Sequence, residues 1–246
     1  MRTRGGWAGR LVVVAMLAAG VWIGVEIWTW PSVQRLAVER PATTAFIEQY
    51  RARQRAAGRP DRVASGWTPY GAISPALKRA VLVAEDVNFF SHRGFALDEM
   101  QNALEDALRD HELPRGASTI TQQLAKNLWL SKSRNPMRKA REALLTWQIE
   151  HTLSKRRILE LYLSVVEFGP GLYGVGAASQ RYFGKPASQL TDDEAAELAA
   201  SLPSPATWHP GSSRPGYRRH VESIKRRMAK ATFLKSSLAA IADESL

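Results

Sequence analysis

Four strong helix-start signals follow one another along the chain and constrain its fold more than any other feature. Each begins with a serine, threonine or asparagine, whose side-chain oxygen can accept a hydrogen bond from a free N–H of the first helical turn. The signals are Ser74-Pro75, Thr119 with Gln122, Asn135-Pro136 and Thr191 with Glu194. Proline at the first helical position and the three-residue spacing of a capping box strengthen the prediction. No alternating strand pattern or internal repeat accompanies these signals, so the sequence predicts a mainly α-helical fold.

The caps and the hydrophobic periodicity together predict where the helices lie. Apolar residues at positions 97, 100, 104 and 108 share one helical face, and those at 120, 124 and 128 share another. The predicted helices cover residues 31–57, 76–85, 97–108, 120–130, 136–153, 155–168, 191–203 and 217–242. Glycine and proline at 58–60 and 66–69 predict a linker.

The N-terminal region contains a second constraint, an uncharged run from Leu11 to Val25. The hydrocarbon core of a bilayer needs about 20 helical residues, so the run alone is short. Arg10 and Glu26 flank it, and the stretch 7–30 is long enough because such side chains can extend to the interfaces. The sequence therefore predicts one N-terminal transmembrane helix.

Arginines on the N-terminal side of this run predict its orientation. Arg2, Arg4 and Arg10 precede the run, and basic flanks stay on the cytoplasmic side of a membrane. We therefore expect the N-terminus in the cytoplasm and everything after residue 30 outside it. A cleaved signal peptide, with residues 18–20 (AAG) as a poor cleavage site, is the alternative. Either way, the bulk of the chain is expected to be exported.

Composition excludes some chemistry and requires an anionic partner. The chain has no cysteine, which excludes a disulfide scaffold, a thiolate metal site and a cysteine nucleophile. Lys and Arg total 34 and Asp and Glu total 23, so the net charge is +11. Nucleic acid, acidic lipid and a phosphorylated substrate are all compatible with that charge.

Glu85 is the first candidate for catalysis because it ends an apolar run, residues 80–84 (AVLVA). Burial raises the pKa of a carboxyl group, and a raised pKa suits a general base. The alternative is a solvated acid at a helix C-terminus. An acid at that position opposes the helix dipole, which favours a functional role.

A cluster of cations surrounds the helix start at Asn135-Pro136. Arg134, Arg138 and Lys139 lie at this start, and Lys126 can reach it across the preceding connection. Cations at a helix N-terminus are unfavourable unless an anion binds there, since free N–H groups and basic side chains then converge on it. The sequence predicts an anion site, with a solvated basic surface patch as the alternative.

Two further acids and one glycine string complete the candidates. Glu160 and Glu167 are seven residues apart and are predicted on one face of the helix 155–168, although Arg156 to Glu160 is also an ordinary surface pair. Residues 169–174 fit a GxGxxG string, but a predicted helix precedes it and no parallel sheet surrounds it, so we reject dinucleotide binding. The sequence has no P-loop, HExxH motif or zinc-ligand cluster.

Five segments, in order, resemble the motifs of the family 51 glycosyltransferases, the peptidoglycan glycosyltransferases of bacterial cell-wall synthesis. They are residues 85–94 (EDVNFFSHRG), 116–127 (GASTITQQLAKN), 138–142 (RKARE), 155–163 (KRRILELYL) and 168–184. Ala117 and Ser164 depart from the usual glycine and asparagine of these motifs. The length, the anchor and the absence of SxxK and KTG strings resemble the monofunctional biosynthetic type, without a transpeptidase domain.

The resemblance implies a lysozyme-like helical glycosyltransferase domain with a membrane-facing jaw. It assigns residues 1–30 to the cytoplasmic tip and anchor, 31–65 to a juxtamembrane helix and linker, 66–215 to the catalytic domain and 216–246 to a basic C-terminal helix. The implied reaction polymerises lipid II into β-1,4-linked glycan, releasing undecaprenyl pyrophosphate. The implied location is the inner (plasma) membrane, single-pass, with the catalytic domain periplasmic.

The resemblance also implies a role for each candidate residue. Glu85 is the base, and Glu160 is the second catalytic acid, with Glu167 a competitor for that role. Secondary contacts are Ser118, Gln123 and Glu142, and the pyrophosphate is held by Lys126, Arg134, Arg138 and Lys139. No obligatory cofactor is expected, and a divalent cation (Mg²⁺ or Mn²⁺) assisting the pyrophosphate remains open.

The expected partners are lipid II, the growing glycan strand, the cytoplasmic membrane and other cell-wall synthases, with no nucleic acid. Two alternatives stay open on the sequence. One is a lysozyme-like enzyme that cuts glycan with two carboxylates, although neutral glycan gives no reason for four clustered cations. The other is a membrane-anchored scaffold or nucleic-acid binder. We also predict, with a core position as the alternative, that residues 128–130 (LWL) touch the bilayer, and that the final basic helix lies against anionic headgroups.

Overall fold

The structure is a computed structural model that describes residues 6–96, 101, 118–131, 133 and 135–242. Arg134, Ala117 and the predicted helix at 97–108, apart from residue 101, lie outside the described residues. The chain forms two compact units, Met1–Ser32 and Val33–Leu246. The first unit contains one helix, α1 (Gly6–Trp28). Within the described part of the chain, no helix has the combination of length and apolar character needed to cross a membrane, so the predicted anchor is not confirmed.

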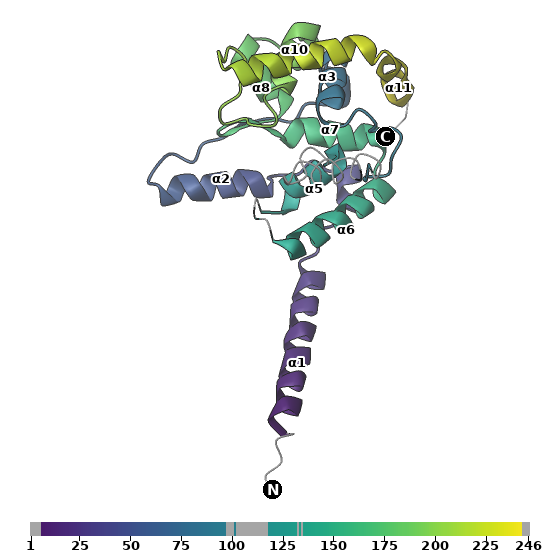
Figure 1. Cartoon of the computed structure of the whole chain (residues 1–246). Helices are drawn as coiled ribbons and strands as arrows, with labels where there is room; N and C mark the ends of the chain where they lie inside the picture. The colour runs from purple at the N-terminus through teal and green to yellow at the C-terminus, as the bar shows by residue number, and fades with distance from the viewer. Residues whose placement is uncertain (1–5, 97–100, 102–117, 132, 134, 243–246) are drawn as a thin grey trace. The chain divides into compact units, whose positions relative to one another are not determined.

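The second unit is mainly helical, as the caps predicted (Figure 1). Its α-helices are α2 (Ala45–Ala56), α3 (Pro75–Glu85), α5 (Ile120–Trp129), α6 (Pro136–Thr152), α7 (Lys155–Val165), α8 (Val175–Phe183), α9 (Asp192–Ala199), α10 (Pro215–Lys230) and α11 (Phe233–Ala242). Short 3-10 helices are η1 (Gln34–Ala37), η2 (Tyr70–Ala72) and η3 (Ala187–Gln189). The strands are β1 (Ala64–Ser65), β2 (Glu167–Gly169) and β3 (Leu172–Tyr173).

All four predicted helix starts are confirmed. Ser74 accepts a hydrogen bond from the backbone N–H of Leu77, and Asn135 accepts one from that of Met137. Thr119 and Thr191 each form a complete capping box with the residue three positions on. These interactions satisfy N–H groups that the helices themselves leave free, and they fix where α3, α5, α6 and α9 begin.

Two packed groups of helices make the core, and they position the candidate site. The helix α3 has a buried apolar face and packs against α9, α10 and α11. The helix α5 packs against α6, α7 and α2. In Figure 1, α5 lies beside α6 below α7, with α3 and α10 above. The C-terminal end of α3 meets α5, because Gln123 of α5 hydrogen-bonds to Glu85 at the end of α3.

The segment after α7 differs from its prediction as continuous helix. The helix α7 ends at Val165, and Glu167 lies in β2, so Glu160 and Glu167 do not share a helical face. β2 pairs antiparallel with β3, which pairs parallel with β1, in a three-stranded sheet of order β1-β3-β2. Gly174 follows β3 with a φ of +81°, and a Cβ there would lie 2.5 Å from the Ser164 carbonyl oxygen. This close approach explains the helix end that periodicity missed.

Three other predicted helices are shorter than expected. The segment 31–57 contains η1 and then α2 only from Ala45, and α9 ends at Ala199 instead of Pro203. The final basic segment is broken into α10 and α11 at residues 231–232.

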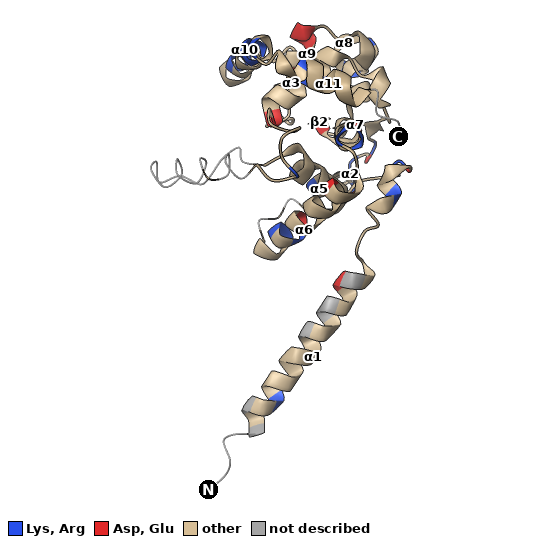
Figure 2. Ribbon diagram, turned by 90° about the vertical axis from the view of Figure 1, so that its right-hand side faces the viewer, with Lys and Arg blue, Asp and Glu red and all other residues tan. Residues whose placement is uncertain are grey.

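The predicted bilayer contact of residues 128–130 is wrong for two of its residues. Leu128 and Leu130 are both buried within the protein. The helix α10 likewise has a protein partner, since it buries Tyr217, Val221 and Ile224 and packs against α3 and α9. Exposed basic residues of α10 include Arg218, Arg219 and Arg226, and Figure 2 shows Lys and Arg of this helix in blue.

Candidate active site

Glu85 is the last residue of α3 and is partly buried. One carboxylate oxygen accepts a hydrogen bond of 2.7 Å from the side-chain amide of Gln123. Burial raises the pKa of Glu85, while the Gln123 hydrogen bond and the charges of Lys126 and Arg227 oppose that rise. The sequence prediction of a desolvated carboxyl group at the end of an apolar run is therefore confirmed.

The neighbouring acid, Asp86, ties the site to the start of α5. Its carboxylate accepts hydrogen bonds from the backbone N–H of Ile120 (2.9 Å) and from Nε2 of His92 (2.8 Å). The N–H of Gly94 donates to Nδ1 of the same imidazole (3.1 Å), so Nδ1 is unprotonated and Nε2 carries the proton. Asp86 thus joins two motif segments and sets the position of α5 relative to Glu85.

Gln123 connects Glu85 to a second buried residue, Tyr162 of α7. The hydroxyl of Tyr162 donates to Oε1 of Gln123 over 2.9 Å, and the amide nitrogen of Gln123 donates to Glu85. That nitrogen also lies 3.5 Å from the carbonyl oxygen of Ser118, which is itself exposed. Three helices therefore contribute to the surroundings of one carboxylate.

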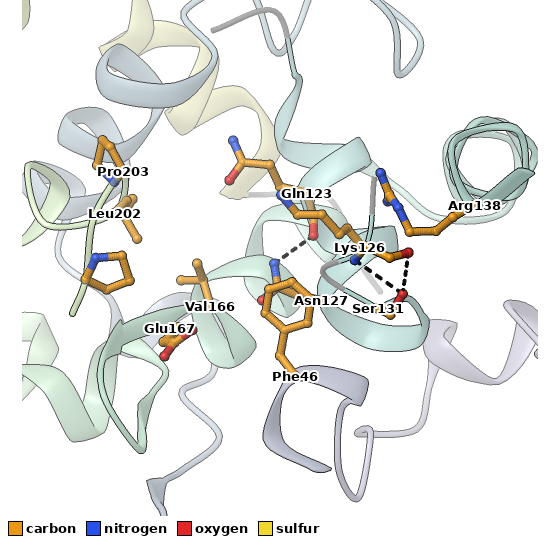
Figure 3. Close-up of a pocket in the computed structure, with 12 residues that line it drawn as sticks. Phe46, Gln123, Lys126, Asn127, Ser131, Arg138, Val166, Glu167, Leu202 and Pro203 are labelled. Atoms are coloured by element: carbon orange, nitrogen blue, oxygen red, sulfur yellow. Dashed lines mark hydrogen bonds between the residues drawn. The ribbon is translucent and has the colours of Figure 1, made fainter. Parts of the chain in front are cut away.

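A cavity of about 580 Å³ is lined by Gln123, the residue that hydrogen-bonds to this carboxylate (Figure 3). Figure 3 shows Lys126 and Arg138 on one side of it and Leu202 and Pro203 on the other. The helix α5 contributes Gln123, Lys126 and Asn127 to its polar lining. Its full lining is Phe46, Gln123, Lys126, Asn127, Ser131, Ser133, Arg138, Val166, Glu167, Leu202, Pro203 and Pro205.

Lys126 is the cation of this cavity with the most altered electrostatics. Burial lowers its pKa, and the charges of Arg138 and Lys139 lower it further, while Glu142 and Glu85 raise it. Lys126 thus interacts with the carboxylate on α3 and with the cations of α6. A half-buried cation that is incompletely neutralised can gain from an anionic ligand.

The first two turns of α6 hold two cations on one shared carboxylate. Arg138 donates to one oxygen of Glu142 over 2.6 Å, and Lys139 donates to the other. Glu142 is 4% exposed in its side chain, whereas Lys139 is 51% exposed. The predicted convergence of Lys126, Arg138 and Lys139 is found in the structure, and Glu142 is their counter-charge.

The structure does not bring Glu160 into this cluster. Its two oxygens accept hydrogen bonds from the backbone N–H of Tyr70 (2.9 Å) and from Arg157 (2.6 Å). Tyr162 lies two residues further along α7, about 200° around the helix, and it is Tyr162 that faces Gln123. Glu167, the competing acid, lines the cavity from β2.

Comparison with known proteins gives this arrangement a family. A sequence model described as Transglycosylase matches residues 53–229. The chain belongs to the transglycosylase family.

The relatives of this transglycosylase cover almost its whole length. Proteins named biosynthetic peptidoglycan transglycosylase from Thiobacillus denitrificans and Azoarcus sp. are each 44% identical, over 93% and 94% of this chain and 97% and 98% of their own. One from Ralstonia nicotianae is 42% identical over 92% of this chain and 97% of its own. The family match makes the chain a glycosyltransferase, and no comparison supports the glycan-cleaving alternative.

Two residues near Glu85 of the transglycosylase were missed by sequence reasoning. No local sequence signal marks Tyr162, and the packing of α7 on α5 reveals its hydroxyl contact. Arg227 of α10 donates to the carbonyl oxygen of Val83 (2.8 Å), two residues before the end of α3. It lies 144 positions along the chain from Val83, and no local pattern signals such a contact.

The motif departure at Ser164 has a clear structural role. Its hydroxyl accepts from the backbone N–H of Thr68 (3.3 Å) and donates to the Thr68 carbonyl (3.2 Å). It thereby holds the chain before η2 against α7. Among the described residues, no three histidine, aspartate or glutamate side chains gather in a metal-binding group.

Proposed function

We propose that this chain polymerises lipid II into β-1,4-linked glycan strands and releases undecaprenyl pyrophosphate. One observation carries the proposal above the others: Lys126, a half-buried cation of the cavity, interacts electrostatically with Glu85 on one side and with the Arg138–Lys139–Glu142 cluster on the other. A carboxylate suited to accept a proton is thus next to a site suited to bind an anionic leaving group. The relatives named biosynthetic peptidoglycan transglycosylase support the same reaction.

Glu85 acts as the general base in this proposal. It takes the proton from the 4-hydroxyl of the acceptor GlcNAc as that oxygen attacks C1 of the donor MurNAc with inversion. A pKa raised by burial makes Glu85 a stronger base than a solvated carboxylate. The Gln123 amide holds one of its oxygens by a hydrogen bond, which orients the carboxylate.

The cations neutralise the leaving pyrophosphate. Negative charge grows on that group as the bond to C1 breaks, and fixed cations at that point stabilise the transition state. Lys126 and Arg138 line the cavity, and Lys139 shares Glu142 with Arg138. We assign Arg134, which lies outside the described residues, to the same group because it immediately precedes the α6 cap.

The roles of the other acids follow from their partners. Glu142 organises Arg138 and Lys139 and so contributes to the leaving-group site. Glu160 was predicted as the second catalytic acid, but both its oxygens accept hydrogen bonds from protein groups, which favours a positioning role. Glu167 retains its competing role because it lines the cavity. Ser118 remains a secondary substrate contact.

The membrane is the source of the substrate in this proposal, and two features support contact with it. We assign residues 7–30 as an anchor of the inner membrane, with the catalytic domain on the periplasmic side. Extraction by detergent, and not by alkaline carbonate, would support the anchor; release by carbonate would contradict it. The second feature is a row of exposed apolar residues on one side of α6: Met137, Leu144 and Trp147.

A spin label tests the α6 contact, because the chain has no cysteine of its own. A nitroxide on Leu144→Cys in proteoliposomes should be relaxed more by oxygen, which partitions into lipid, than by a water-soluble nickel chelate. A label on Arg226→Cys, exposed on α10, should show the opposite preference. Identical behaviour at the two positions would remove the membrane contact of α6.

Incubation of the purified full chain with lipid II tests the proposed function. We expect glycan polymer that moenomycin, the inhibitor implied by the family resemblance, blocks. Lys126→Met should lower kcat by roughly 100-fold, since one charge at the developing anion is lost. A wild-type protein that makes no polymer with or without Mg²⁺ or Mn²⁺ would contradict the proposal.

The same polymerisation assay also tests whether the reaction requires a divalent metal ion. We propose that no metal is obligatory, because cationic side chains already occupy the leaving-group site. Chelation with EDTA should then leave at least a substantial fraction of the activity. Complete loss, restored by Mg²⁺ or Mn²⁺, would assign part of the pyrophosphate neutralisation to a divalent cation. The proposal includes the growing strand and other cell-wall synthases as partners and excludes nucleic acid.

A further inference from the structure

The surroundings of Glu85 contain a hydrogen-bond relay that crosses three helices. Tyr162 of α7 donates to Gln123 of α5 over 2.9 Å, and Gln123 donates to Glu85 of α3 over 2.7 Å. Tyr162 is 0% exposed, so water does not compete for its hydroxyl. Both hydrogen bonds are short enough to define the positions of all three side chains.

The direction of each hydrogen bond is fixed by the chemistry of the groups. Oε1 of Gln123 has no proton and can only accept, so the Tyr162 hydroxyl donates to it. The amide nitrogen carries both protons and therefore faces the Glu85 carboxylate. Burial and the charges of Glu85 and Asp86 raise the pKa of Tyr162 well above its usual value. Tyr162 consequently remains a neutral donor whenever Glu85 titrates.

We propose that Tyr162 is a positioning residue that locks the amide of Gln123 toward Glu85 and thereby favours the carboxylate form of the base. The proposal rests on the proposed function, in which Glu85 must be unprotonated to accept the substrate proton. In the proposed mechanism Tyr162 touches neither the substrate nor the reacting atoms, and it acts on Glu85 through Gln123 alone.

The physical reason lies in what happens when Glu85 takes up a proton. A protonated carboxyl group donates, and it would be best paired with Oε1 of a Gln123 amide turned by 180°. That rotation directs the amide nitrogen at the Tyr162 oxygen and deprives the buried phenolic proton of its acceptor. An unsatisfied buried donor is costly. Tyr162 therefore opposes the arrangement that would stabilise protonated Glu85.

Tyr162→Phe removes the hydroxyl that disfavours rotation of the Gln123 amide, and it keeps the aromatic ring in place. We expect the acidic limb of the kcat/KM profile for lipid II polymerisation to move to higher pH by about one unit. Tyr217→Phe is the matched control, because Tyr217 is also buried and its hydroxyl donates to a backbone carbonyl, that of Glu197. The control should leave the acidic limb unchanged.

A double-variant cycle separates action through Gln123 from simple packing. Gln123→Met abolishes both ends of the relay, so adding Tyr162→Phe to it should move the acidic limb no further. Additive shifts would overturn the proposal. So would a Tyr162→Phe protein that loses activity with its acidic limb unmoved, since that result indicates packing alone.

A direct titration makes the proposal independent of the polymerisation assay. The full chain, labelled with ¹³C at glutamate carboxyl groups and held in detergent micelles, should show a Glu85 signal that is absent in Glu85→Gln. That signal should titrate at higher pH in Tyr162→Phe than in the wild type, and an unchanged titration would refute the relay. Absence of polymer from the wild type would refute the proposed function and leave this measurement intact.

Discussion

Glu85 and Glu160 carry the same functional group in opposite surroundings. Glu160 accepts hydrogen bonds on both oxygens, one of them from the guanidinium of Arg157, within a buried region that also holds Tyr70 and Lys78. Glu85 receives one hydrogen bond from a neutral amide, and its cationic neighbours act on it at longer range. The difference teaches that burial alone does not make a catalytic base. A buried acid must also lack a direct cationic partner before it can exchange protons with a substrate.

The largest expected effect is a loss of activity when Glu85, and not Glu160, is replaced. Glu85→Gln should lower kcat by about 10²–10⁴-fold, because general-base catalysis contributes that much. Stability should not fall, since a carboxyl group with a raised pKa loses stability as pH rises through its folded-state pKa, and the amide removes that cost. Polymer formation from lipid II measures the loss of kcat, and thermal unfolding in the same detergent measures the stability.

Glu167→Gln is the companion variant for this measurement, because Glu167 lines the same cavity from β2. A similar loss of kcat in Glu167→Gln, with Glu85→Gln active, would transfer the role of base. Full activity in Glu85→Gln alone would show that Glu85 is not the general base.

The second prediction concerns the stability of the other region. Glu160→Gln leaves the buried Arg157 charge without its counter-charge, and removal of one partner of a buried ion pair costs roughly 3 kcal/mol or more. Folded enzyme should retain most of its kcat. Urea unfolding monitored by tryptophan fluorescence measures the loss of stability. Single-turnover polymerisation measures the activity of the folded enzyme.

An exposed acid provides the control for Glu160. Glu222 pairs with Lys225 at the surface of α10, and Glu222→Gln should change stability by no more than about 1 kcal/mol. A stable Glu160→Gln protein that has lost its kcat would restore Glu160 as the second catalytic acid.

The third prediction uses Lys78, a buried cation in the same region as Glu160. Burial and the charge of Arg156 lower the pKa of Lys78 to about 8. The folded state then binds the Lys78 proton less tightly than the unfolded state does. The resulting loss of folding stability is present in full below pH 8 and disappears as pH rises towards 10.5. Lys78→Met should raise stability at pH 7 by about 1–2 kcal/mol, with activity unchanged.

The measurement for Lys78 is the pH dependence of unfolding. Between pH 8 and 10 the advantage of Lys78→Met over the wild type should shrink. A constant difference across that range would show that the hydrogen bond from Lys78 to the Tyr70 carbonyl (3.2 Å) decides its contribution.

The smallest predicted effect returns to Glu85. The charge of Arg227 lowers the pKa of Glu85, so Arg227→Met should move the acidic limb of the activity profile upward by a few tenths of a pH unit. Raised salt should produce part of the same shift in the wild type, because the guanidinium is accessible to solvent. Arg226→Met, an exposed neighbour on α10, should leave the profile in place.

The parts of the structure that local chemistry determines could be predicted from sequence. Each helix start follows from a cap and the residues within one turn. Glu85 follows an apolar run whose side chains had to be buried in the core, so its own partial burial could be predicted. The cations of α6 converge because they share two helical turns. These features involve interactions between residues close in the chain.

The features that were missed depend on distant residues. Glu160 and Glu167 share a heptad spacing, but Gly174 approaches the Ser164 carbonyl and the chain leaves the helix between the two acids. The partner of Glu160 at Tyr70 is 90 positions away, and that of Tyr162 at Gln123 is 39. No periodicity within one helix contains that information, so the division of labour between the acids required the tertiary packing.

The shared carboxylate of Glu142 has a consequence for turnover. Arg138 and Lys139 carry two positive charges and share one carboxylate in the absence of substrate, so the proposed pyrophosphate would meet cations that are half compensated instead of bare. The net gain on binding is therefore smaller than it would be for bare cations, because the phosphate oxygens compete with Glu142. When the product departs, Glu142 again holds both cations, which reduces the positive charge that would retain the diphosphate. Moderate affinity for the leaving group is built into the first two turns of α6.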